Sequence, residues 1–188
     1  MRNRMHLARS RINWSKADRW LDIGAGTGLF LELAEEYGSP SEFFGIDLSE
    51  KMLECARAKK YKTVQTTFLQ KNFMEELPDE PFSLVTALGV LQKCGVPLAL
   101  ALRRIGELAT PGGEIFLTTK NATWRQFEDS QSTPFTGHHW FGPEQLLHNC
   151  RNAGLRVMEI GSFDPASNSV SDNLRKHHSL FILARKEL

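Results

Sequence analysis

The stretch Trp20-Leu-Asp-Ile-Gly-Ala-Gly-Thr-Gly28 is a short apolar run that ends in closely spaced glycines. Directly after it, apolar side chains recur at helical spacing in residues 29–34. This order predicts a strand, a glycine turn and a helix, an arrangement that brings bare backbone and a helix N-terminus up to a ligand. A tight turn that only packs the helix on a sheet would use the same glycines, so the stretch alone leaves both interpretations open.

The rest of the chain repeats this order of apolar run, turn and helical pattern. We expect further strands at residues 42–46, 63–69, 82–88, 114–119, 155–162 and 179–184, and helices at 49–58, 97–108 and 143–153. Such alternation is typical of an α/β fold with a mostly parallel sheet, here of seven strands. The segment 164–175 is polar and turn-rich, so we expect the last two strands to pair antiparallel through a long loop.

The composition is that of a single globular domain. The chain has 188 residues, of which 41% are hydrophobic and 24% charged. Its cysteines, Cys55, Cys94 and Cys150, are far apart and form no Cys-x-x-Cys pair, which argues against a disulfide scaffold and against structural zinc. No apolar run approaches the roughly 18 residues of a membrane span, and no apolar segment follows the basic N-terminus, so we expect a cytoplasmic protein without membrane contact.

The N-terminal segment is strongly basic. Residues 1–19 have a net charge of +5, whereas the rest of the chain has −4. A basic leader attracts phosphate, nucleic acid or an acidic partner, but it is equally the pattern of a solvated helix end. We therefore expect a basic leader or cap at residues 1–19 and the main domain at residues 20–188.

An acidic residue follows the second expected strand. Asp47 lies 19 positions after Gly28, close to the spacing of a carboxylate that accepts ribose hydroxyls in nucleotide-binding folds. Together, the glycines and Asp47 indicate a nucleoside cofactor, although Asp47 would also serve as the cap of the next helix. Leu29 stands where the dinucleotide fingerprint has its last glycine, which disfavours NAD, and the absence of a following Gly-Lys-Ser/Thr excludes a Walker loop.

From Trp20 to its C-terminus, the chain resembles the class I S-adenosylmethionine-dependent methyltransferases. Leu21-Asp-Ile-Gly-Ala-Gly-Thr-Gly28 is similar to the first motif of that family almost letter for letter. Further matches follow in the family's order at Phe44-Gly-Ile-Asp-Leu-Ser49, Asn72-Phe73, residues 82–91, Pro111-Gly-Gly113 and residues 141–146. The resemblance implies a Rossmann-like, doubly wound sheet of seven strands with the last one antiparallel, and S-adenosyl-L-methionine as the cofactor.

The resemblance also implies roles for individual residues. Asp22 and the glycines Gly24, Gly26 and Gly28 would hold the methionine portion of the cofactor, and Asp47 its ribose. The adenine and the substrate side would be lined by Leu48, Phe73, Asn72, Leu88 and Gly89. The family usually has Asp where this chain has Asn72, but an amide both donates and accepts hydrogen bonds, so we expect adenine recognition to survive with altered bonding.

The acceptor is less well defined by the sequence. His138 and His139 lie in the segment that opens at the substrate side, so they are candidates for a general base or for substrate positioning, unless the pair is simply exposed. The aromatic residues of the same region suit a planar or apolar small molecule with an oxygen or nitrogen nucleophile; they are Trp124, Phe127, Phe135, Trp140 and Phe141. Gln92 stands where small-molecule members of the family commonly have His, and no histidine has partners at metal-ligand spacing, so we expect no metal.

Other functions stay open at this point. The basic leader is compatible with an RNA or protein methyltransferase, and cofactor motifs alone do not exclude a regulatory or scaffold subunit that binds cofactor without turnover. The short cap of about 19 residues predicts an open site that accepts a bulky substrate or that is closed by a partner or by a second copy in a homodimer. A small-molecule methyltransferase is the function that we expect.

Overall fold

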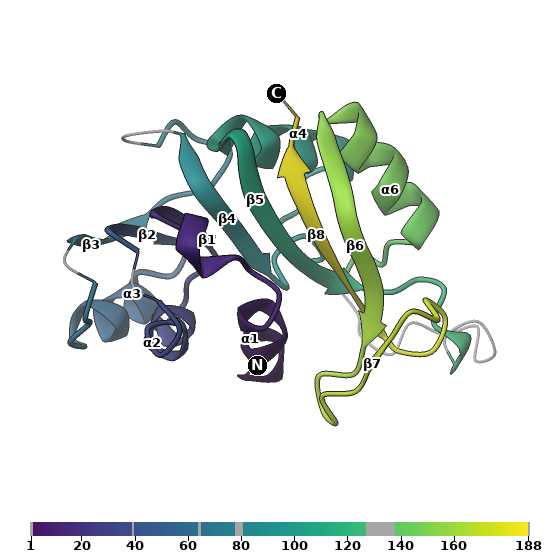
Figure 1. Ribbon diagram of the computed structural model, residues 1–188, viewed down its shortest axis with the longest axis horizontal. Helices are drawn as coiled ribbons and strands as arrows, with labels where there is room; N and C mark the ends of the chain where they lie inside the picture. Colours follow the sequence, from purple (N-terminus) through teal and green to yellow (C-terminus); the bar gives the residue numbers. More distant parts are fainter. Residues whose placement is uncertain (1, 39, 64, 78–80, 127–137, 188) are drawn as a thin grey trace.

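The computed structural model describes residues 2–38, 40–63, 65–77, 81–126 and 138–187. Its centre is an eight-stranded sheet in the order β3-β2-β1-β4-β5-β8-β6-β7 (Figure 1). The strands are β1 (Arg19–Ile23), β2 (Glu42–Asp47), β3 (Gln65–Gln70), β4 (Phe82–Leu88), β5 (Ala109–Lys120), β6 (Leu155–Phe163), β7 (Val170–Ser171) and β8 (Ser179–Lys186). The helices are α1 (Arg2–Arg9), η1 (Trp14–Lys16), α2 (Leu29–Ala34), α3 (Glu50–Arg57), α4 (Leu98–Leu108) and α6 (Pro143–Asn152).

The expected α/β architecture is confirmed. Strands β3, β2, β1, β4 and β5 pair in parallel, and β8 runs antiparallel between β5 and β6. The expected count of seven strands was one too low, because β7 pairs with Ser162 and Phe163 at the edge of the sheet. A strand of two residues is too short to show a periodic pattern, so the sequence predicts a loop at Val170–Ser171, within segment 164–175.

Helices cover both faces of the sheet (Figure 1). Trp20 joins a core shared with α1, α2 and α3, whereas its neighbour Leu21 joins a core shared with α4 and α6. The split follows from strand geometry, because successive side chains of β1 point to opposite faces. The first core is rich in aromatic rings: Trp20 meets Phe30 and Phe43 edge to face at centroid distances of 4.9 and 4.8 Å.

The basic leader is a helix packed on the body. Met5, Leu7 and Ala8 of α1 are buried in the same core as Trp20. On the outer side of the leader, Arg9, Arg11 and Arg19 form ion pairs with Glu36, Glu159 and Glu42 at 3.1, 3.1 and 2.7 Å. Much of the positive charge counted in the sequence is therefore matched by acidic side chains of the body.

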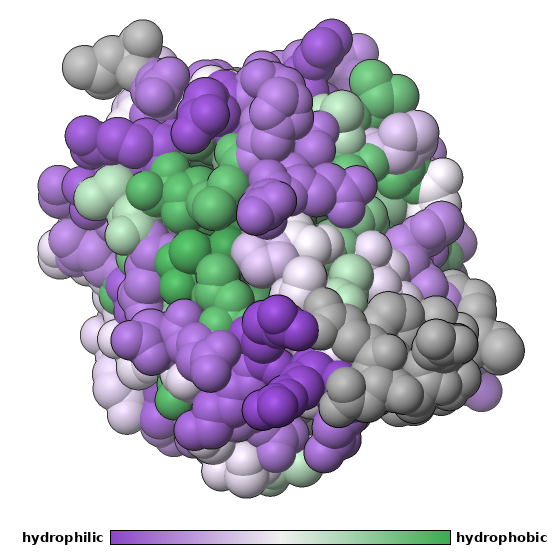
Figure 2. All heavy atoms as spheres, turned by 90° about the vertical axis from the view of Figure 1, so that its right-hand side faces the viewer, coloured by the Kyte–Doolittle hydropathy of each residue, from purple (hydrophilic) through white to green (hydrophobic). Residues whose placement is uncertain are grey.

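The surface on the α6 and β6 side is mostly hydrophilic, with an apolar area between charged side chains (Figure 2). Met158 of β6 is 47% exposed, and Val170 of the short edge strand is 39% exposed. None of the helices in the described ranges is long and apolar enough to cross a membrane.

Candidate functional site

The glycine turn lies at the carboxyl ends of the parallel strands, the edge at which open α/β sheets bind ligands. Gly24, Gly26 and Gly28 have φ angles of 76°, 56° and 70°, a left-handed conformation that other residues rarely adopt. The amides of Gly24 and Ala25 donate to the Ile46 carbonyl at 2.8 and 3.0 Å, which fixes the turn against β2. The predicted strand, turn and helix are confirmed here.

The surroundings of the glycines separate them into two kinds. A methyl group on Gly28 would collide with the hydroxyl of Tyr61, so this glycine is needed for packing. A methyl group on Gly24 would also collide, with Val90 at 2.7 Å from the added Cβ, whereas one on Gly26 would lie 3.5 Å from Met52, an ordinary contact. Gly24 is itself exposed. The open part of the turn is therefore Gly24 to Gly26, and Gly28 is buried.

Asp47 is held at the end of β2 by backbone amides. Its Oδ2 accepts a hydrogen bond from Gly26 N–H at 2.9 Å, and its Oδ1 accepts one from Ser49 N–H at 2.9 Å. The cap of α3 is Ser49, whose hydroxyl accepts from Met52 N–H at 3.4 Å, so Asp47 is not the capping residue. Each carboxylate oxygen of half-buried Asp47 keeps lone pairs for further donors, such as the hydroxyls of a ribose.

Asp22 lies one strand away and is buried, with 4% of its surface exposed. The Thr86 hydroxyl donates to its Oδ1 at 2.6 Å and accepts a hydrogen bond from Trp20 Nε1–H at 2.8 Å. Burial raises the pKa of Asp22 to about 7; the negative charge of Asp47 adds to this shift, and the Thr86 hydrogen bond opposes it. No cation in the described part of the chain pairs with Asp22, so its carboxylate is suited to a positively charged ligand group.

Only some of the residues predicted to contact the adenine lie together at the open edge. Leu48 and Met52 are 65% and 47% exposed beside Asp47, which is unusual for large apolar side chains. Asn72 is half-buried, and its Oδ1 accepts from Met74 N–H at 3.1 Å. Phe73 is 4% exposed and lies in the core shared with α4, so its ring mainly packs the fold. Met52 was not among the predicted site residues.

Leu88 and Gly89 end β4, on the substrate side of the predicted site. Gly89 has a φ of 77° and donates its N–H to the Thr118 carbonyl at 3.0 Å. A methyl group on Gly89 would collide with the guanidinium of Arg4 and would lie 3.1 Å from Gln92 Nε2. The helix of the leader therefore reaches the end of β4.

The two candidate histidines lie beside this strand end. His139 is exposed; its N–H donates to the Gln92 carbonyl at 2.9 Å, and its ring stacks on Phe141 at a centroid distance of 6.4 Å. His138 is half-buried, and burial lowers its pKa, with Lys93, Lys120 and Arg4 adding to the shift. A histidine in this position stays neutral at neutral pH and is able to accept a proton.

The predicted aromatic wall is only partly described. Trp140 lies over the ammonium group of Lys120 at 5.6 Å, and Trp124 contacts His178 edge to face at 5.6 Å. Phe127 and Phe135 lie outside the described residues. Within the described ranges, no group of three or more His, Cys, Asp or Glu side chains is arranged to hold a metal ion.

Sequence reasoning missed the basic residues of this site. Arg4 was counted only as part of the leader's charge, and Lys120 is a buried lysine at the end of β5, with 6% of its surface exposed. A lysine directly after an apolar strand was the one signal available for Lys120. For Arg4 there was none, because its position depends on how α1 packs.

Comparison with known proteins identifies the family of the chain and the class of its fold. Residues 2–160 match the family model of a methyltransferase domain. The chain is 29% identical to the ubiquinone biosynthesis O-methyltransferase of Azoarcus sp. (strain BH72), over 74% of this chain and 65% of that protein. It is 27% identical to the protein of the same name from Xanthomonas euvesicatoria pv. vesicatoria (strain 85-10), over 88% of this chain and 74% of that protein.

Among solved structures, the S-adenosylmethionine dependent methyltransferase from Mesorhizobium loti has a TM-score of 0.76 at 21% identity, with 98% of each chain covered. The chain thus spans about two thirds of the length of the Azoarcus relative, and the whole of the Mesorhizobium fold. With the family model covering most of its length, the chain belongs to the methyltransferase domain family, and its fold is that of the solved S-adenosylmethionine-dependent methyltransferases.

Proposed function

We propose that this methyltransferase transfers a methyl group to an oxygen of a small-molecule acceptor, with a nitrogen acceptor as the less favoured choice. The proposal rests on one edge of the sheet. There, Asp47 accepts a hydrogen bond from Gly26 N–H and so fixes the glycine turn. His138 and Trp140 lie near Lys120 at the end of β5. The names of the curated relatives support oxygen as the acceptor atom.

The residues at this edge fit the cofactor. A methyl group on Gly24 would collide with Val90, so only bare backbone leaves room there. The buried Asp22 carboxylate is suited to the methionyl ammonium, either directly or through a water molecule, because a charge-assisted hydrogen bond offsets its burial. Asp47 would accept the ribose hydroxyls, and the exposed Leu48 would cover one face of the adenine.

The remaining predicted contacts complete this arrangement. Gly28 supports the turn from behind, and Asn72 and Phe73 border the adenine side. Leu88 and Gly89 would line the methyl group. The bound cofactor supplies a methyl group on a sulfonium, which is an excellent leaving group, so the chief task of the protein is in-line positioning of the acceptor.

A proton must leave an acceptor hydroxyl during transfer. His138 is the better placed of the two histidines, because its lowered pKa keeps it neutral and ready to accept that proton. His139, exposed and bound through its backbone to Gln92, would hold the segment in place. The basic side chains around His138 would also favour the ionised form of a phenol.

The first test is calorimetric titration of the purified protein with S-adenosylmethionine, S-adenosylhomocysteine and NAD. We expect binding of both adenosyl sulfur compounds and none of NAD. A radiolabelled methyl-transfer assay with catechols, aromatic amines and tRNA then identifies the acceptor class, and we expect transfer to catechols. Cofactor binding without transfer to any acceptor would favour a regulatory or scaffold subunit, and transfer to tRNA alone would contradict the proposal.

A further inference from the structure

A hollow of about 480 Å³ lies just beyond the carboxyl end of β5. We call it the basic hollow, and the described residues that line it are Trp124, Arg125, Gln126, Asn173, Arg175 and Lys176. Three of these side chains are cations, two are amides and one is an indole, and none of the six is acidic. Such a lining suits an anion better than a neutral or positively charged ligand.

The two walls of the basic hollow come from distant parts of the chain and are joined by one buried side chain. Asn121 is 0% exposed, and its Nδ2 donates to two carbonyls of the loop before β8 at 2.6 and 2.7 Å. Its Oδ1 accepts from the N–H and the hydroxyl of Thr123 at 3.0 and 2.9 Å. Arg125 N–H then donates to the Arg175 carbonyl at 3.0 Å. The backbone that carries the cations is therefore held in place before any ligand binds.

The cations of the basic hollow lie close to one another. Arg175 and Lys176 are neighbours in the chain, and the backbone hydrogen bond joins Arg175 to Arg125. All three residues are exposed, so a ligand in the hollow has access to their side chains. Burial and then the charge of Lys176 lower the pKa of His177, whereas the charge of Asp164 opposes this shift. An anion that binds between the cations would relieve their mutual repulsion.

The basic hollow adjoins the substrate side of the proposed methyl-transfer site. Trp124 lies edge to face against His178, with 5.6 Å between the ring centroids. Burial and then the charge of Lys120 lower the pKa of His178 to about 4, so this ring lies within reach of the charge at the end of β5. Ala122 N–H donates to the Phe141 carbonyl at 3.1 Å, in the segment that also carries the two candidate histidines. The hollow and the candidate base therefore belong to one continuous edge of the molecule.

A phosphate group is the anion that fits this lining best. It presents up to two negative charges and three acceptor oxygens, and the hollow offers two guanidinium forks, an ammonium group and two amides as donors. A carboxylate has one charge and two oxygens, so it would leave some of these donors without an acceptor. Arg125 follows Lys120 by five residues, so their Cα atoms lie within roughly 17 Å, a span that one elongated molecule is able to bridge.

Building on the proposed function, we propose that the methyl acceptor is a phosphorylated small molecule whose phosphate binds Arg125 and Lys176 in the basic hollow while its hydroxyl reaches the methyl-transfer site. The indole of Trp124 would cover the part of the molecule next to the phosphate. The cofactor does not account for the hollow, because S-adenosylmethionine carries no phosphate. Nucleic acid fits less well, because a strand of phosphates needs a continuous basic stripe, and the arginines of the leader with described contacts are paired with glutamates.

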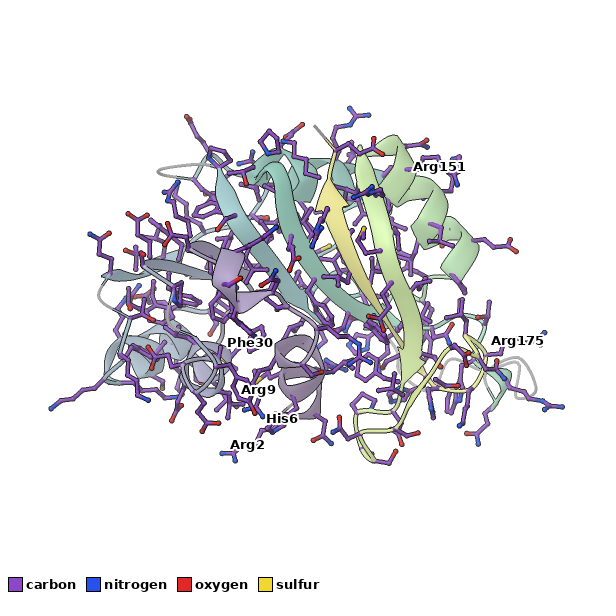
Figure 3. All side chains as sticks on the ribbon, viewed as in Figure 1. Arg2, His6, Arg9, Phe30, Arg151 and Arg175 are labelled. Atoms are coloured by element: carbon purple, nitrogen blue, oxygen red, sulfur yellow. The ribbon has the colours of Figure 1, made fainter. Side chains whose placement is uncertain are left out.

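The test titrates phenyl phosphate, phenol and inorganic phosphate, followed by NMR, into protein saturated with S-adenosylhomocysteine, which fills the cofactor site first. The variants are Arg125→Gln and Lys176→Gln. Arg151→Gln is the control, because it removes an exposed cation of α6 that Figure 3 shows well apart from Arg175. Thermal melting checks that each variant folds.

We expect phenyl phosphate to bind more tightly than phenol or inorganic phosphate. Arg125→Gln and Lys176→Gln should each weaken its binding about 3- to 10-fold, since solvent partly screens these charge-assisted contacts. Binding of phenol, and every titration of Arg151→Gln, should change less than about twofold. Binding of phenyl phosphate that is no tighter than that of phenol, or that survives both substitutions, overturns the inference.

Two further comparisons identify the source of the phosphate. If inorganic phosphate binds as tightly as phenyl phosphate, the hollow holds a free anion rather than a substrate, and the inference is wrong. The same conclusion follows if phenyl phosphate does not bind, while tRNA or vesicles of phosphatidylglycerol bind in a manner that Arg125→Gln abolishes.

A methyl-transfer assay separates this inference from the proposed function. We expect 3,4-dihydroxybenzyl phosphate to have a KM about 10-fold lower than that of 3,4-dihydroxybenzyl alcohol, and Arg125→Gln should reduce this difference. Phosphate-selective binding without transfer to either compound would support the basic hollow while contradicting the proposed reaction. Methylation of both compounds with equal KM values would overturn the inference and leave the proposed reaction intact.

Discussion

At the residue scale, the site depends on two carboxylates in different surroundings. Asp47 is half-buried and held by two backbone amides, so its orientation is fixed before any ligand binds. Asp22 is fully enclosed, and its pKa of about 7 reflects burial that only the Thr86 hydroxyl offsets. The first carboxylate is preorganised for neutral hydroxyls, and the second is suited to a cation.

We expect Asp47→Ala to weaken binding of S-adenosylhomocysteine by about 1.5–3 kcal/mol, the usual contribution of hydrogen bonds to a charged group. Isothermal titration calorimetry measures the change. Ser49→Ala is the matched control, because it removes the cap of α3 and lowers stability by about 1 kcal/mol but removes no proposed ligand contact. Equal affinity of Asp47→Ala and the unaltered protein would contradict the ribose assignment.

The pKa of Asp22 predicts a pH dependence with a definite sign. In the unfolded chain this carboxyl ionises near 3.8, and in the folded protein near 7. Its burial therefore leaves stability unaffected below about pH 4 and lowers stability as the pH rises towards 7. Asp22→Asn should raise the melting temperature of the ligand-free protein at pH 8 but not at pH 4, as followed by circular dichroism.

The affinity for ligand should depend on pH in the opposite direction from the stability. Only ionised Asp22 pairs with the methionyl ammonium, so affinity for S-adenosylhomocysteine should increase as the pH rises from about 6 to 8. In Asp22→Asn the affinity should be lower and the slope flat. A slope that survives the substitution would assign the pH dependence to another group.

At the element scale, the glycine turn has a buried half and an open half. The backbone of Gly28 is covered by Tyr61 and Phe68, side chains that link α3 and β3 to the start of α2. Gly24 and Gly26 lie on the open side. The motif therefore packs α2 on the sheet through Gly28 and leaves the backbone of Gly24 and Gly26 open, which is why both interpretations fitted the sequence.

Gly28→Ala should destabilise the protein more than Gly112→Ala. Both glycines have a left-handed backbone, with φ of 70° and 75°, so both substitutions carry the strain of about 1–2 kcal/mol for a side chain there. An added methyl group at position 112 meets nothing within 4 Å, whereas at position 28 it must displace Tyr61. We expect a further loss of about 1–3 kcal/mol in urea unfolding. Equal losses would show that Tyr61 moves aside freely.

At the scale of the whole molecule, the fold places the arginines of the leader in different surroundings. Arg9, Arg11 and Arg19 are matched by glutamates, and Arg4 turns towards the sheet edge. The basic hollow is separate from these residues, and it is lined by Trp124, by Arg175 and by neighbouring basic and amide side chains. Figure 3 shows Arg175 on the side of the molecule remote from α1, so the exposed positive charge is scattered and does not form one stripe.

This distribution predicts weak binding of nucleic acid. Fluorescence anisotropy with labelled tRNA should show little association at physiological salt, because Arg9, Arg11 and Arg19 of the basic leader are paired with glutamates and have less charge to offer a phosphate. The affinity of a dedicated RNA methyltransferase would instead be substantial and would fall steeply with salt. Tight, salt-dependent binding that Arg125→Gln or Arg175→Gln abolishes would support the RNA alternative.

Much of the fold was predictable from local signals. The apolar runs of β1, β2 and β4, the Ser49 cap and the glycine stops give clear boundaries, because local sequence determines periodicity and turn chemistry. The resemblance to a family then implied a doubly wound sheet with its last strand antiparallel and suggested roles for Asp22 and Asp47. The strand β7 was missed because two residues carry no period.

The sequence by itself determined the class of fold, the glycine turn and the acidic residue that ends β2, since these depend on neighbours in the chain. Only the tertiary structure decided which glycine faces the open edge, that Phe73 lies in the core, and that Arg4 lies against Gly89 beside the end of β4. Those facts depend on contacts between residues far apart in sequence, and such contacts are set by helix packing rather than by any local pattern.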